Sequence, residues 1–166
     1  MSTVTLTVST GGASKVAPGQ TISFNIGGAS ISAGSVINGI ILKPTLARSP
    51  TGPTASEIIL NVTDTRNDAS TTSTINKVSS TTPAPYPSFN NPIFGSDNEL
   101  YGLSTWNANS FTSSGFTVHL RHVGSTGLFY WEATGTEAII HFSDPEGGNI
   151  KLTTGNIKLT AGKITL

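Results

Sequence analysis

Hydrophobic and polar residues alternate along most of this chain, in runs of strand length. Residues 4–8 alternate valine and leucine with threonine, and residues 21–26 and 57–63 repeat the pattern. A period of two is typical of strands that bury one face. Residues 36–42 are more continuously apolar, which predicts a central strand. Because no stretch carries the i, i+3, i+4 apolar spacing of a useful helix, the pattern predicts an all-β protein.

The second half of the chain adds further strands. Residues 115–123 alternate well, and residues 128–132 and 137–142 complete the set. About seven or eight short strands separated by turn residues are typical of a β-sandwich or jelly roll. We therefore expect an antiparallel β-sandwich domain over residues 1–143.

Two segments between these strands are predicted to be loops. Residues 43–56 contain three prolines and a glycine. Residues 64–98 lose the period and are rich in serine, threonine and asparagine, with a weak strand near 74–78. Long aperiodic segments are uncommon in compact domains and often make contacts. An exposed surface arm and a specific partner contact both remain open for residues 64–98.

The C-terminal segment, residues 144–166, contains a seven-residue repeat of glycine, isoleucine and leucine. Isoleucine and leucine are two residues apart, which places them on one face of a strand and does not fit a coiled coil. So small an apolar face invites pairing with another surface. The tail either winds with those of two neighbours or folds back on its own sandwich. The predicted assembly interface comprises Ile150, Leu152, Ile157, Leu159, Ile164 and Leu166.

Composition limits the functions that remain. The formal net charge is zero and 11% of the residues are charged, so no basic face for nucleic acid is expected. Cysteine is absent, which excludes disulfides and cysteine-based zinc sites. No apolar run approaches the roughly 18 residues of a membrane span, and the start of the chain lacks signal-peptide features. We expect synthesis in a host cytoplasm without conventional secretion.

Candidate catalytic side chains are sparse. On a strand, His119 and His122 point to opposite faces and cannot share a metal ion, while His141 is expected to point outward. The carboxylates form only three close pairs, which are Asp64 with Asp68, Asp97 with Glu99, and Asp144 with Glu146. None of these pairs has as many oxygen ligands nearby as a calcium-binding loop. None is a convincing match to the two facing carboxyl groups of a glycosidase. The sequence therefore predicts no catalytic, cofactor or metal site, and a non-enzymatic protein.

Aromatic side chains offer one competing interpretation. Tyr86, Trp106 and Trp131 are candidates for stacking on a sugar or contacting a partner. Tyr130 and Trp131 point to opposite faces on alternation, so one is expected in the core and the other at the surface. The alternative is that these rings belong to the core and to a subunit interface.

Part of the aromatic pattern resembles a known module. The residues that carry it are 100–102 (Leu-Tyr-Gly), Trp106, Phe111, the strand 116–120 and Tyr130. They resemble a β-sandwich module found in many phage virion and tail proteins, over about two-thirds of the chain. That module often has an aspartate after the tyrosine, where this chain has tryptophan. The resemblance implies a sandwich fold and a structural role in a virus particle.

Together, the resemblance, the repeat and the small size predict a homotrimeric capsid decoration, or cement, protein that stabilises a phage head. Its expected partners are other copies of itself and the major capsid protein or other virion proteins. Neither nucleic acid nor membrane is expected as a partner, and no cofactor is required. The expected location is the virion. The alternative function is a receptor- or glycan-binding module of a tail fibre or surface protein.

Overall fold

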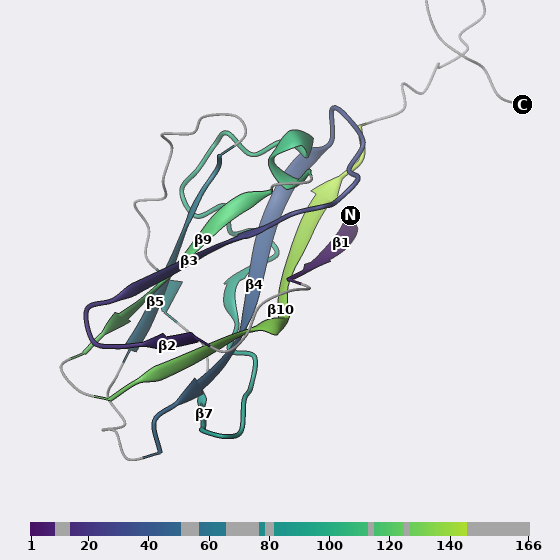
Figure 1. Ribbon diagram of the computed structural model, residues 1–166. Helices are drawn as coiled ribbons and strands as arrows, with labels where there is room; N and C mark the ends of the chain where they lie inside the picture. Colours follow the sequence, from purple (N-terminus) through teal and green to yellow (C-terminus); the bar gives the residue numbers. More distant parts are fainter. Residues whose placement is uncertain are drawn as a thin grey trace, which may run out of the picture.

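The computed structural model describes residues 1–8, 14–50, 57–65, 77–78, 82–112, 115–124 and 127–145. These residues form two β-sheets that pack face to face (Figure 1). The only helix among them is one turn of 3-10 helix, η1 (Ala108–Phe111). The predicted all-β sandwich is therefore confirmed.

The larger sheet has the strand order β1-β10-β4-β7, with β2 paired to β10 and β8 paired to β4. The smaller sheet has the order β3-β9-β5-β6. All pairings are antiparallel except that of β7 with β4. The larger sheet comprises β1 (Ser2–Thr7), β2 (Ser14–Val16), β4 (Val36–Arg48), β7 (Ala84–Pro85), β8 (Phe94–Ser96) and β10 (Phe129–Ser143). The smaller comprises β3 (Thr21–Ile26), β5 (Glu57–Thr63), β6 (Lys77–Val78) and β9 (Phe116–Val123).

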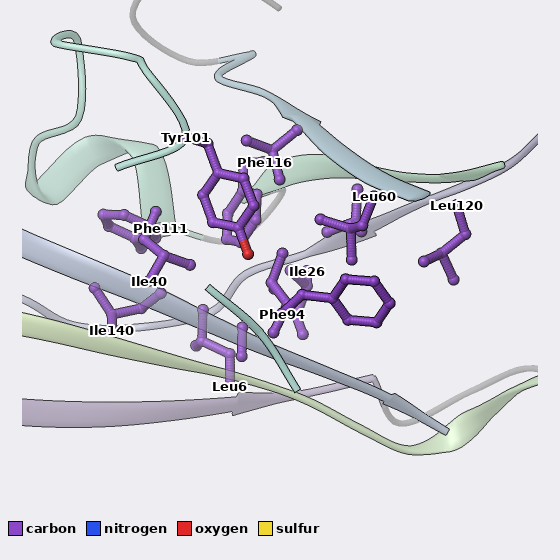
Figure 2. Close-up of a cluster of buried hydrophobic side chains, with 14 of the residues drawn as sticks. Leu6, Ile26, Ile40, Leu60, Phe94, Tyr101, Phe111, Phe116, Leu120 and Ile140 are labelled. Carbon is purple, nitrogen blue, oxygen red and sulfur yellow. The ribbon is translucent and has the colours of Figure 1, made fainter. Parts of the chain in front are cut away.

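Alternation along the strands builds the core between the sheets. In β9, Phe116, Val118 and Leu120 are buried, while the residues between them lie on the outer face. Tyr101 is fully buried, and Figure 2 shows its ring directed into the apolar cluster. Gly95 makes room for this ring, because a Cβ at that position would lie 2.7 Å from the tyrosine oxygen. Burial raises the pKa of the Tyr101 phenol well above its ordinary value.

The prediction of a loop starting at residue 43 is wrong, because β4 continues through Pro44 to Arg48. Proline lacks the N–H that a strand ladder needs, so it is normally confined to edges and bulges. Here the β4–β10 register shifts between Glu132 and Glu137, which leaves a bulge beside Pro44. The same bulge joins two predicted strands, 128–132 and 137–142, into the single strand β10.

One threonine organises the bulge. The Thr136 hydroxyl accepts hydrogen bonds from the Thr45 backbone N–H at 3.0 Å and from the Trp131 indole N–H at 3.1 Å. It also donates to the Glu132 carbonyl at 2.8 Å. The side chain therefore replaces ladder bonds that the interrupted register cannot make.

Residues 82–98 do not extend away from the domain. Asn90 and Leu46 exchange two backbone hydrogen bonds, at 2.9 and 3.0 Å, and β8 pairs with β4. The Asn91 amide donates to the Thr45 hydroxyl at 2.9 Å and to the Gly135 carbonyl at 3.0 Å. This part of the predicted loop lies against the larger sheet, which corrects the interpretation as an arm. Residues 66–76 and 79–81 lie outside the described residues, and the weak predicted strand includes β6.

Replacing Thr136 with valine should destabilise the fold by about 2–4 kcal/mol, because two buried N–H donors lose their acceptor. Urea denaturation followed by tryptophan fluorescence measures the loss. Thr134→Val is the matched control, since Thr134 is exposed on the same bulge, and we expect it to change stability by no more than about 0.5 kcal/mol. Equal effects of the two changes would contradict the assigned role of Thr136.

Candidate functional site

The free edge of β1 is the first feature of interest. Among the residues that the structure describes, β1 ends the strand order of the larger sheet and pairs only with β10. The Val8 N–H donates to the Thr136 carbonyl at 3.0 Å, so alternate residues up to Val8 direct their main-chain groups toward β10. The main-chain N–H and C=O groups of Thr3, Thr5 and Thr7 therefore point away from β10, toward the free edge. Their side chains are exposed on the outer face of the sheet.

The side of the sandwich next to this edge is apolar and incompletely covered. β3 is the last strand of the smaller sheet among the described residues. Its Phe24 ring stacks on the Trp131 ring of β10, with 4.5 Å between the ring centroids. β3 and β1 therefore lie along the same lateral side of the sandwich. Five partly buried hydrophobic residues pack against the core from β1, β3 and the segments that follow them. We call this set the β1–β3 side; it consists of Val4, Val8, Ile22, Phe24 and Ile31.

The last described residues lie beside β1. Ser2 at the start of β1 lies opposite Phe142 near the end of β10. The Ser2 hydroxyl donates to the Asp144 carboxylate at 2.9 Å. The repeat tail therefore begins at the Ser2 end of β1. The six predicted assembly residues, Ile150 to Leu166, lie outside the described residues.

The three aromatic candidates differ in exposure. Trp106 and Trp131 are only 8% and 7% exposed, so neither offers a ring face to a sugar or partner, and that expectation is corrected. Tyr86 is 43% exposed. It stacks on Tyr130 at 4.4 Å, with Phe89 edge-on to it at 6.0 Å. The prediction that Tyr130 and Trp131 point to opposite faces is correct, with Trp131 in the core.

The buried tryptophans also explain part of the aromatic pattern. The Trp106 indole N–H donates to the Leu100 carbonyl at 2.8 Å, and its ring stacks on Phe111 at 5.5 Å. Phe116 lies edge-on to both rings. These residues form an aromatic cluster at the end of the core that contains η1, so they hold the fold together.

The histidines occupy two environments. His119 lies on the outer face of the smaller sheet, between the hydroxyls of Ser23 at 2.7 Å and Thr63 at 2.8 Å. His122 faces the core, fully buried, with its ring edge-on to Phe129 at 4.7 Å. Its Nδ1 atom lies 3.3 Å from the Val16 carbonyl oxygen, while its Nε2 atom is buried without a hydrogen-bond partner. The prediction of opposite faces is correct.

Two carboxylates of the described residues, Asp64 and Glu99, make hydrogen bonds within the fold. Asp64 is fully buried and accepts hydrogen bonds from the hydroxyls of Thr105 at 2.9 Å and Ser110 at 3.2 Å. The Glu99 carboxylate accepts from the Tyr101 backbone N–H at 2.6 Å. Among the described residues, no group of three or more histidine and acidic side chains could hold a metal ion. That part of the chain also contains no helix long and apolar enough to cross a membrane.

The fold and these features define an all-β sandwich whose most distinctive site is an open strand edge beside the start of a repeat. No protein-family profile, curated protein or solved structure matches this chain. The site is therefore interpreted from its own residues. Sequence reasoning missed the edge, although the alternating threonines of residues 3, 5 and 7 were visible, because the position of a strand in its sheet depends on topology.

Lowering the pH should destabilise the protein below about pH 6.5. Burial lowers the pKa values of His122 and His119 from the ordinary value of 6.5. The unfolded chain then binds more protons than the folded one, so stability is complete above pH 6.5 and falls as the pH decreases. Urea denaturation between pH 8 and pH 5 measures this. His122→Leu should flatten the pH dependence, whereas His119→Gln should keep the contribution of His122; an unchanged slope in His122→Leu would contradict this assignment.

Proposed function

We propose that this protein is a non-enzymatic structural protein of a phage particle, a homotrimeric capsid decoration protein that stabilises the head. The observation that carries the proposal is the position of Asp144, where the repeat tail begins, against the first residue of the outer strand β1. Unpaired edges and uncovered apolar faces favour association with another chain. The resemblance of the aromatic strand pattern to phage virion modules supports a location in the particle.

The proposed mechanism is thermodynamic. Contacts that exist only in the assembled state stabilise that state by mass action, in proportion to the concentration of partners. A decoration protein that bridges neighbouring copies thereby raises the free energy needed to pull the shell apart. The partners are other copies of the chain and the major capsid protein or other virion proteins.

The use of polar side chains supports a structural role. Asp64 and Asp144 accept hydrogen bonds from distant parts of the sandwich, and Glu99 accepts one from the nearby Tyr101 backbone N–H. The His119 ring lies between two hydroxyls instead of beside a carboxylate. A serine nucleophile is normally activated by a histidine that an acidic group orients. Among the described residues, the Ser23–His119 pair has the Thr63 hydroxyl as its third partner and no acidic group, which fits a surface hydrogen-bond network better.

The oligomeric state tests the assembly proposal directly. One copy has a mass of 17.1 kDa, and we expect light scattering to give the full chain three times that mass. Ile157→Lys combined with Leu159→Lys should convert it to a folded monomer, because both changes place charges on the apolar face of the repeat. Lys158→Thr is the matched control, since residue 158 stands between the isoleucine and the leucine in the sequence, and it should leave the mass unchanged. A full chain that is monomeric in solution would contradict the proposal.

The position in a particle tests the decoration role. Quantitative mass spectrometry of purified particles should find many copies of the protein per capsid, and removing it should lower the temperature at which the heads release DNA. A copy number matching a tail, or unchanged head stability, would contradict a decoration role while leaving assembly intact.

One observation favours a second function, a glycan-binding module of a tail fibre or surface protein. The exposed Tyr86 ring, supported from below by Tyr130, is a flat surface of the kind that stacks on sugars. A glycan array followed by fluorescence titration tests this. Saturable binding that Tyr86→Ala abolishes and Ile93→Ala leaves intact would favour it, since Ile93 is equally exposed at 41%. Absence of binding across the array would eliminate it.

A further inference from the structure

We propose that the free edge of β1 binds the first repeat strand, residues 150–154, of a second copy of this chain. The added strand would lie antiparallel to β1 and extend the larger sheet. This inference rests on the proposed assembly function and specifies the surface that receives the tail. It is argued from the main-chain groups of the edge, the side chains beneath it and the place where the tail begins.

The main chain of β1 is suited to receive a strand. Thr3, Thr5 and Thr7 direct their N–H and C=O groups to the free edge, as the register with β10 requires. Natural edge strands are usually protected by lysine, proline or a bulge. The β1 sequence, STVTLT, contains none of these residues and runs for six residues in regular register. The edge therefore has the properties of a strand that pairs.

The side chains are complementary on both faces. Ile150 and Leu152 are two residues apart, so in an added strand both can face the interior, over the β1–β3 side. Val4, Val8 and Ile31 of that side are only partly buried. The residues that alternate with the isoleucine and leucine, Lys151 and Thr153, would then lie outward beside the exposed threonines of β1. An apolar inner row and a polar outer row continue the pattern of the sheet.

The length of the tail favours a second copy as the donor. The tail begins at the Ser2 end of β1, and an antiparallel strand on the free edge must start at the Thr7 end. β1 has six residues and is about 20 Å long. Residues 144–149, which precede Ile150, span at most about 20 Å when fully extended. Little length remains for the crossing over β1 and for a turn, which disfavours an antiparallel first repeat strand from the same chain and favours one from a second copy.

Proline at position 5 tests the edge. Thr5→Pro removes an N–H that points to the free edge and leaves the bonds between β1 and β10 in place. Thr5→Val keeps the N–H and is the matched control. In the full chain, we expect Thr5→Pro to weaken the assembly by about tenfold or more per interface, as measured by dilution in analytical ultracentrifugation. Thr5→Val should assemble like the parent, and circular dichroism and urea denaturation establish that both variants are folded.

Engineered cysteines test the contact without depending on proline. The chain has no cysteine, so a single introduced thiol is unambiguous. A full-length Thr5→Cys copy and a full-length Lys151→Cys copy, dissociated, mixed and reassembled, should form a disulfide-linked pair under copper phenanthroline. Thr21→Cys is the control for Thr5→Cys, because Thr21 is exposed on β3 and should not cross-link.

The outcomes separate this inference from the function on which it rests. A full chain that assembles while Thr5→Pro does not, together with the cross-link between different copies, supports the inference. Normal assembly of folded Thr5→Pro without a cross-link overturns it and leaves the assembly function intact. Cross-linking within one molecule carrying both cysteines, at high dilution, overturns the assignment to a second copy. A full chain that is monomeric at all concentrations overturns both.

Discussion

The pairing of β4 with β10 is the interaction on which the rest of this structure depends. These are the two longest strands, at 13 and 15 residues, and they pair from one end of the larger sheet to the other. Every other strand of that sheet attaches to one of them. β1 and β2 lie along one flank of β10, and β7 and β8 lie along the far flank of β4. The pair therefore determines which strand is left with a free edge.

The bulge within this ladder links several parts of the fold. Pro44 interrupts the hydrogen bonding, and the Thr136 hydroxyl supplies the missing acceptor. Asn91 then binds Thr45 and the Gly135 carbonyl, which fastens residues 82–98 to the sheet. A local defect in the ladder thus becomes the attachment point of residues 82–98. This explains why a segment without periodicity can have a defined path.

The strands that alternate clearly in sequence were predictable, because alternation reports burial of one face directly. This holds for β1, β3, β5 and β9, and for the opposite orientations of Tyr130 and Trp131. Pro44 misled the prediction, since its compatibility with a strand depends on a bulge formed with residues more than 90 positions away. Trp106 could not be placed from sequence either, because it lies in an aperiodic segment and its burial depends on Phe111 and Phe116.

The candidate site was harder to predict than the fold for a related reason. The repeat tail shows one half of an interaction in sequence, as an apolar face too small to be stable alone. The other half, an edge with unpaired main-chain groups, is a property of strand order, and local pattern does not encode it. The sequence of β1 is typical of a half-buried strand. Only its position at the end of the described strand order makes it available to pair with another strand.

The chemistry of such an edge also suits a decoration role better than a free soluble complex. One added strand of five residues forms few main-chain hydrogen bonds, and each contributes only about 1 kcal/mol net. A single contact of this kind is weak against the entropy lost on association. In a closed ring, however, each copy donates one tail and receives another, so every copy is held at two interfaces. On a capsid surface, where neighbours are already fixed close together, the effective concentration rises further and the same contact becomes strong. Under the proposed function, this chain would therefore assemble most firmly where a shell has already positioned it.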